Sequence, residues 1–154
     1  LKRAKLEQLE DIIETLPWVA TIDQFQHGLY ENPNHTSTER VKLWNKVFAR
    51  FADTETDWSG LEENRDYMWQ KQLHLYEVPF YYIEYGMAQL GAIALWRNYK
   101  RNNKEGLQGY MNALKLGNLT TIPEIYKAAN IKFDFSRAYI KELMDFVKEE
   151  MAKI

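Results

Sequence analysis

Residues 79–96 read Pro79-Phe-Tyr-Tyr-Ile-Glu-Tyr-Gly-Met-Ala-Gln-Leu-Gly-Ala-Ile-Ala-Leu-Trp96, an almost continuously apolar stretch. Its length is close to that of a membrane-spanning helix. However, Glu84 and Gln89 interrupt it, three tyrosines lie near its start, and the basic segment 97–101 follows it. An ionisable group in mid-span fits a helix buried inside a protein better than one in lipid. We therefore predict a buried helix over residues 79–96 and no membrane span.

Helical signals continue on both sides of this stretch. Apolar residues recur at helical spacing between Leu6 and Leu29, which predicts one helix, or two if Pro17 interrupts it. Three other segments open with Ser or Thr followed three residues later by Glu, the spacing of a capping box. No segment has the alternation of a strand. We expect an all-α fold, with helices over residues 3–30, 36–52, 59–75, 79–96, 107–117, 121–129 and 136–151.

Length and composition predict one domain. The chain has 154 residues and no cysteine, which excludes disulfides, thiolate zinc sites and thiol nucleophiles. Its 20 Lys and Arg against 22 Asp and Glu give a formal net charge of −2, so no basic surface for nucleic acid is expected. We expect a single all-α domain over residues 1–154 in the cytoplasm. The chain begins without Met inside a helical pattern, which predicts a part of a longer protein.

The three histidines of the chain are His27, His35 and His74, and none belongs to a His-Glu-x-x-His motif. Asp23 lies four residues before His27, so the two side chains could share one helix face as metal ligands. A surface hydrogen bond is the more frequent role of such a pair, and we interpret this pair as structural. The chain itself is therefore predicted to hold no metal.

The segment His74-Leu-Tyr-Glu-Val-Pro-Phe-Tyr-Tyr-Ile-Glu-Tyr85 is the strongest candidate for chemistry. If Pro79 starts a helix, Tyr81 and Tyr82 are four and three residues before Tyr85, so at least two phenols converge on one side. Phenol and imidazole donors aimed at one point stabilise the negative oxygen of a tetrahedral intermediate. The alternative is that these tyrosines pack in the core with their hydroxyls bonded to the backbone.

The same segment lies within a longer resemblance. Residues 16–27, 30–36, 57–62, 69–92, 122–129 and 131–136 carry it, including Trp69-Gln-Lys-Gln-Leu-His74 directly before the tyrosines. Together they closely resemble the C-terminal part of oligoendopeptidase F, a zinc metallopeptidase related to thimet oligopeptidase. The resemblance departs at Asn130, where glycine is expected.

The resemblance implies a part of an all-α catalytic domain in which short peptides are cut inside a deep channel. It implies a zinc ion held upstream of this part by His-Glu-x-x-His and a later glutamate, with zinc-activated water attacking the peptide bond. On this chain it implies His74, Tyr82 and Tyr85 as catalytic residues that stabilise the oxyanion. It implies Phe80 and Tyr81 as substrate-binding residues, and the spacing leaves open whether Tyr81 or Tyr82 is the oxyanion donor.

The hypothesis from the sequence is therefore the C-terminal part of a zinc metalloendopeptidase that is inactive by itself and binds no zinc alone. Its expected partners are oligopeptide substrates and the upstream remainder of the parent chain, with no nucleic acid and no membrane. Exposure of the aromatic side chains Phe80, Tyr81, Tyr82 and Tyr85 is also expected to allow self-association. A free-standing helical peptide-binding module without catalysis, and a purely structural scaffold, are the alternatives.

Overall fold

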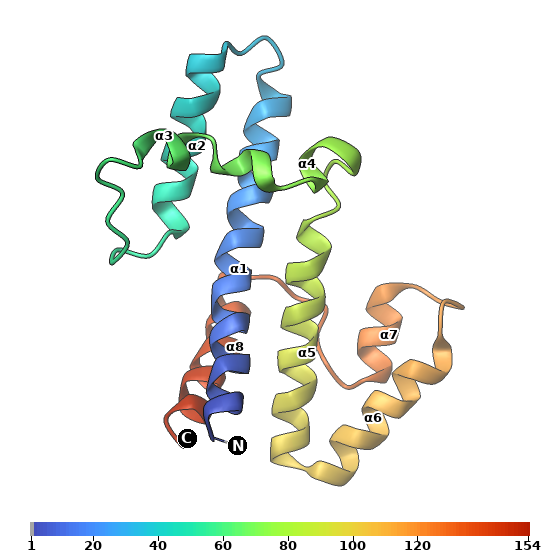
Figure 1. The fold of residues 1–154 in the computed structure, drawn as a ribbon. Coiled ribbons are helices and arrows are strands. Elements are labelled where there is room, and N and C mark those ends of the chain that lie inside the picture. The colour runs from blue at the N-terminus through green and yellow to red at the C-terminus, as the bar shows by residue number, and fades with distance from the viewer. Residues whose placement is uncertain (1) are drawn as a thin grey trace. The chain divides into compact units, whose positions relative to one another are not determined.

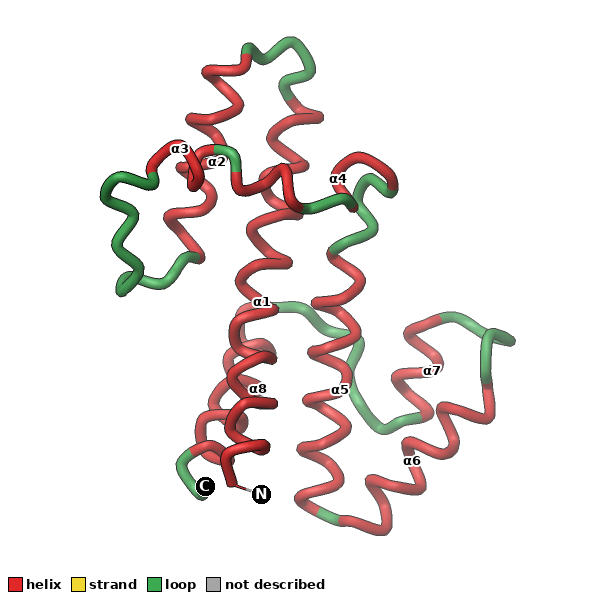
Figure 2. Tube along the Cα trace, viewed as in Figure 1, coloured by secondary structure: helices red, strands yellow, loops and turns green. Residues whose placement is uncertain are grey.

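The computed structural model describes residues 2–154, which form helices and loops with no strand among them (Figure 2). The predicted all-α fold class is therefore confirmed. The helices are α1 (Lys2–Glu31), α2 (Ser37–Phe51), α3 (Glu62–Asp66), η1 (Met68–Lys71), α4 (His74–Glu77), α5 (Ile83–Arg101), α6 (Asn103–Leu116), α7 (Ile122–Ala128) and α8 (Arg137–Met151).

Two compact units divide the chain, and the divisions fall within α1 and α5. The central unit consists of residues 11–86, and the terminal unit consists of residues 2–10 together with residues 87–154. The expectation of one domain over residues 1–154 stays a prediction. None of the helices in residues 2–154 combines the length and the apolar character needed to cross a bilayer.

The central unit is built on α1 and α2, which lie side by side and are joined by the loop 32–36 (Figure 1). α1 continues through Pro17, so the single helix is the right one of the two alternatives. At the start of α2, the Glu39 carboxylate accepts the backbone N–H of Thr36 and the Thr36 hydroxyl accepts the N–H of Glu39. This confirms the predicted capping box. The core between the helices contains Ile22, Phe25, Trp44, Val47 and Trp69.

The predicted helix over residues 59–75 is wrong, because three short helices, α3, η1 and α4, replace it. The Asp57 carboxylate accepts the backbone N–H of Ser59 at 2.9 Å, so Ser59 belongs to a turn. Such a local side-chain bond competes with helix capping. α3 accordingly begins without a side-chain cap. Further along, Trp69 enters the core and is only 6% exposed.

The terminal unit joins the first residues of α1 to α6, α7, α8 and most of α5. α8 runs alongside the start of α1 (Figure 1), and the Lys2 ammonium donates a 2.8 Å hydrogen bond to the carbonyl of Ile154. The predicted capping pair opens α7, since Glu124 accepts the N–H of Thr121. At the start of α8, Ser136 accepts the N–H of Tyr139. The buried apolar residues of this unit include Leu9, Leu90, Ile93, Tyr139, Leu143 and Val147.

Two turns of the terminal unit depend on positive φ angles. Gly117 follows α6 at the predicted end of the helix, with φ of 51° and ψ of −126°. Asn130 has φ of 57°. Asparagine is among the residues that enter this left-handed region most readily. The chain therefore makes this turn without the glycine expected there.

Candidate active site

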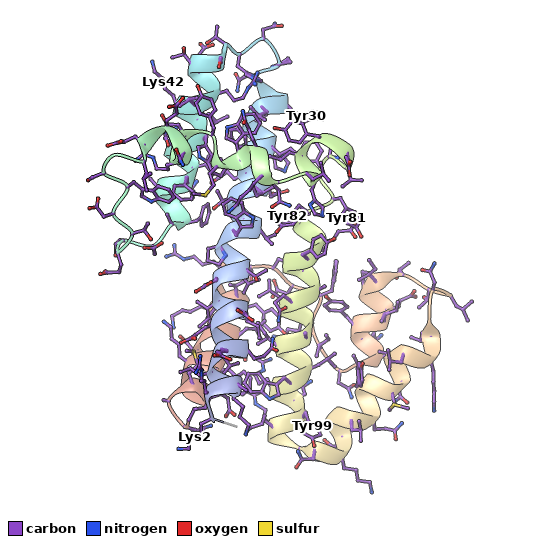
Figure 3. All side chains as sticks on the ribbon, in the orientation of Figure 1. Lys2, Tyr30, Lys42, Tyr81, Tyr82 and Tyr99 are labelled. Atoms are coloured by element: carbon purple, nitrogen blue, oxygen red, sulfur yellow. The ribbon has the colours of Figure 1, made fainter. Side chains whose placement is uncertain are left out.

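The candidate site lies in the central unit, where a turn joins α4 to α5. α5 begins at Ile83, so the predicted helix start at Pro79 is wrong, and Tyr81 and Tyr82 precede the helix (Figure 3). The reason is Phe80, whose φ of 62° is not helical. The buried side chain of Gln26 accepts the backbone N–H of Phe80 at 2.8 Å and holds this conformation.

His74, Tyr82 and Tyr85 converge in spite of this different backbone. The His74 ring lies 4.7 Å from the Tyr82 ring and 5.5 Å from the Tyr85 ring, measured between centroids. Nε2 of His74 is 3.4 Å from the Tyr85 hydroxyl, a long contact for a hydrogen bond. Tyr85 is 46% exposed. The structure thus brings together the three residues that the sequence assigned to catalysis.

Tyr81 and Phe80 are placed differently from each other. The ring of Tyr81 packs edge-on against that of Tyr85, with centroids 5.8 Å apart, and the side chain is 45% exposed. The ring of Phe80 lies against His27 and Tyr30 of α1, at 5.0 and 4.9 Å. Tyr81 therefore borders the His74 cluster, whereas Phe80 belongs to a neighbouring aromatic surface. Their substrate-binding role stays a prediction.

Tyr82 is the most enclosed of the site phenols. It is half-buried and packs against the core of the central unit. Burial raises the pKa of the Tyr82 hydroxyl above its ordinary value, the nearby Trp18 indole lowers it in part, and Tyr85 adds a small increase. The Tyr82 phenol therefore stays protonated at neutral pH and keeps its hydrogen-bond donor.

Two residues next to His74 were not assigned from the sequence. Gln72 Nε2 lies 2.6 Å from Nδ1 of His74, and Gln72 Oε1 accepts the indole N–H of Trp18 at 2.9 Å. Trp18 and Gln72 are 54 positions apart in the chain. No local pattern could have paired them, although both lie in stretches that carry the resemblance.

The residues around His74 do not form a zinc site. Within residues 2–154 there is no group of three or more His, Cys, Asp or Glu side chains that could hold a metal ion. The nearest partners of His74 are an amide and two phenols. Asp23 and His27 do face each other on α1 at 3.6 Å, as the pairing on one helix face predicted. The donor set at the site suits hydrogen bonding to a ligand oxygen.

The family of the chain follows from comparison with known proteins. A model described as peptidase family M3 matches residues 1–145. The chain belongs to peptidase family M3. No curated protein sequence gives a significant match to it.

Two solved structures are similar to this M3-family chain. One is designated oligoendopeptidase F, with a TM-score of 0.83, 28% sequence identity and coverage of 99% of this chain. The other is PZ peptidase A with an inhibitor, with a TM-score of 0.82, 28% identity and coverage of 97%. In both cases the similarity spans 27% of the matched protein. The chain thus corresponds to about a quarter of the length of these relatives.

Proposed function

We propose that this chain is the C-terminal part of a metalloendopeptidase that hydrolyses oligopeptides. We also propose that its residues His74, Tyr82 and Tyr85 stabilise the oxyanion. The observation that carries the proposal is the contact of 3.4 Å between His74 Nε2 and the hydroxyl of Tyr85, an exposed residue. Membership of peptidase family M3 supports the peptidase activity, and the two similar structures support the assignment to an oligoendopeptidase F-like parent.

The proposed chemistry is donation of hydrogen bonds to a carbonyl oxygen. When a nucleophile attacks a peptide bond, the carbonyl oxygen becomes negative, and donors already in place stabilise this charge. Tyr85 and Tyr82 each offer a hydroxyl hydrogen, and the His74 ring offers an N–H. A contact of 3.4 Å in the free site is expected to shorten when substrate is bound.

Peptidases of this family depend in general on zinc, which polarises the substrate and activates water when bound. The residues described here do not fit such a site, because no three of their His, Asp or Glu side chains lie close enough together to hold a metal ion. We propose that the upstream remainder of the parent chain holds the zinc. The contribution assigned to this chain is limited to binding and orienting the substrate and stabilising its oxyanion.

The decisive experiment is the steady-state kinetics of Tyr85→Phe in the full-length enzyme, with an internally quenched fluorogenic oligopeptide as substrate. A donor that acts on the oxyanion lowers kcat far more than it raises KM when it is removed. We expect kcat to fall about a hundredfold, as for other oxyanion-hole donors. Tyr82→Phe tests the second phenol in the same assay.

A matched control is Tyr76→Phe. Tyr76 is 56% exposed and lies on α4 two residues after His74, but the structure gives its ring a contact with Trp69 and none with the site phenols. Its kcat should stay within about twofold of the parent enzyme. If Tyr85→Phe and Tyr82→Phe also stay within that range, the oxyanion role is wrong and the residues only pack.

A peptide-binding module without catalysis is the second candidate function. Exposure of Tyr76, Tyr81 and Tyr85 favours it, because three aromatic rings on one short segment can bind a peptide. A binding role predicts that Tyr85→Phe, which keeps the ring, leaves peptide affinity unchanged. It also predicts that neither Tyr85→Phe nor Tyr82→Phe changes kcat of the full-length enzyme. Calorimetric titration with the same oligopeptide measures this affinity.

The isolated chain is proposed to cleave no peptide and to bind no zinc at one equivalent. A fluorogenic assay and metal analysis after dialysis test both statements. Self-association through the aromatic residues 80–85 also stays a prediction, and sedimentation at several protein concentrations measures it.

A further inference from the structure

Four side chains of the central unit form a line of polar contacts that ends at the site. They are Trp18 on α1, Gln72 after η1, His74 on α4 and Tyr85 on α5. The three successive contacts measure 2.9, 2.6 and 3.4 Å. The outermost member, Tyr85, is exposed, whereas Gln72 is half-buried.

The chemistry of the first member sets the direction of the whole line. An indole nitrogen can only donate, so the Gln72 atom that faces Trp18 is the amide oxygen. The Gln72 amide nitrogen therefore faces His74, and an amide nitrogen also only donates. Nδ1 of His74 must accept this hydrogen bond. In the neutral ring the hydrogen is then on Nε2, the atom that faces Tyr85.

We propose that Gln72 and Trp18 are positioning residues that hold His74 in its neutral Nε2–H tautomer. The catalytic part of this inference rests on the proposed function, whereas the tautomer follows from the hydrogen bonds alone. In the free site the N–H of His74 is then directed at the oxygen of Tyr85, so the hydroxyl hydrogen of Tyr85 is free for a substrate oxygen. A substrate oxygen bound beside Tyr85 would accept the same His74 N–H. Donors linked in one direction also polarise one another and strengthen the last donor.

The opposite tautomer of His74 would reverse the direction of its hydrogen bond with Tyr85. With the hydrogen on Nδ1, the Nε2 atom of His74 would become an acceptor and would take the hydroxyl hydrogen of Tyr85. The pair would then present lone pairs to the substrate and would repel a negative oxygen. The side chain of residue 72 thus sets the direction of the hydrogen bond between His74 and Tyr85.

Gln72→Glu is the sharpest test, because it preserves size and still accepts from Trp18 but has no donor for Nδ1. The tautomer of His74 is measured by long-range proton–nitrogen NMR of histidine-labelled protein, with His74→Gln identifying the signal. We expect the parent protein to show the hydrogen on Nε2, and Gln72→Glu to move it to Nδ1 or to protonate both nitrogens. A parent spectrum with the hydrogen on Nδ1, or an unchanged Gln72→Glu spectrum, overturns the tautomer assignment.

Trp18→Phe is a second variant that leaves Gln72 in place. It removes the indole N–H that orients the amide together with part of the ring, and a phenyl ring remains to pack against Trp44, whose centroid is 6.0 Å from that of Trp18. The side-chain amide of Gln72 can then rotate so that its oxygen and nitrogen exchange places, and we expect a mixture of both tautomers of His74. The control is Gln70→Glu, which adds the same charge at an exposed position two residues away and should leave the spectrum unchanged.

Kinetics of the full-length enzyme on the fluorogenic oligopeptide test the positioning role. We expect Gln72→Glu to lower kcat about tenfold or more with little change in KM, and Gln70→Glu to leave both within about twofold. If Tyr85→Phe lowers kcat but Gln72→Glu does not, the positioning role is overturned and the proposed function stands. If none of Tyr85→Phe, Tyr82→Phe and His74→Gln lowers kcat, the proposed function and the positioning role are both overturned, and the NMR spectrum still decides the tautomer.

Discussion

The backbone N–H of Phe80 donates a 2.8 Å hydrogen bond to the side-chain oxygen of Gln26, which lies 54 positions earlier in the chain. Gln26 is only 2% exposed, and Phe80 has a left-handed φ of 62°. Phenylalanine rarely adopts this conformation, because its Cβ crowds the backbone. The pair therefore fixes the turn from which Tyr82 and Tyr85 reach His74.

Gln26→Leu is expected to destabilise the protein by about 1–3 kcal/mol, because the backbone N–H of Phe80 loses its acceptor. The Nε2 atom of Gln26 is buried without a hydrogen-bond partner, so its removal offsets part of this loss. Urea unfolding measures the free-energy difference. Gln70→Leu, at an exposed position, should change it by less than about 0.5 kcal/mol. Equal stability of the two variants would show that the bond to Gln26 does not hold the turn.

Phe80→Gly and Phe80→Ala test the backbone strain directly, since both remove the ring and differ in their tolerance of positive φ. We expect the glycine variant to be the more stable by about 1 kcal/mol. At Tyr81, which does not have a positive φ, the same pair should show the reverse order, with glycine the less stable by about 0.5–1 kcal/mol. Thermal unfolding of the four variants gives both differences. A higher stability of Phe80→Ala than of Phe80→Gly would contradict the left-handed turn.

Glu150 of the terminal unit should make stability depend on pH. It is 6% exposed and contacts the ammonium groups of Lys100, at 2.6 Å, and of Lys153. The hydrogen bond from Lys100, followed by that from Lys153, holds the pKa of the Glu150 carboxyl below its ordinary value. Glu150 in turn raises the pKa of Lys153.

The contributions of Glu150 and Lys153 to stability change with pH in opposite directions. The contribution of Glu150 is complete above the pKa of the unfolded carboxyl and is lost as the pH falls through the lowered folded-state value. The contribution of Lys153 is complete below the pKa of the unfolded amine and is lost as the pH rises through the raised folded-state value. We expect Glu150→Gln to cost about 1 kcal/mol at neutral pH and almost nothing in strong acid. Urea unfolding at a series of pH values, with exposed Glu149→Gln as the control, measures the difference.

Gly106→Ala should destabilise the turn between α5 and α6. A Cβ atom at position 106 would lie 2.5 Å from the Cα atom of Tyr99, and this backbone atom cannot move aside by a side-chain rotation. We expect a loss of about 1–3 kcal/mol from overpacking, in spite of the better helix propensity of alanine. Gln108→Ala, at an exposed position of α6, is the control and should be nearly neutral. A higher melting temperature for Gly106→Ala would be the contradicting result.

The parts of the fold that depend on neighbouring residues were predictable from the sequence. Thr36 and Glu39 are three residues apart, and the start of α2 follows from their two hydrogen bonds. Ser59 and Glu62 have the same spacing, but the prediction failed there because Asp57 takes the N–H of Ser59. A spacing rule does not include such a competing acceptor.

The candidate site was predictable in its members and not in its construction. His74, Tyr82 and Tyr85 were named from their spacing and the resemblance, but a helix from Pro79 was the wrong reason for their convergence. The turn depends on Gln26, and the orientation of His74 depends on Trp18, each 54 positions from its partner. Contacts of this separation are set by the packing of α1 against the later segments, which no local pattern records.

The short helices of the site segment have a consequence for its amide hydrogen exchange. α3, η1 and α4 contain five, four and four residues, whereas α1 contains 30. Helices of one turn gain little from their own hydrogen bonds and open locally at low cost in free energy. We therefore expect the amides of residues 62–77 to exchange their hydrogens well before those in the middle of α1. A bound peptide that contacts His74 and Tyr85 should slow this exchange, so the protection gained on binding would map the residues that the substrate orders.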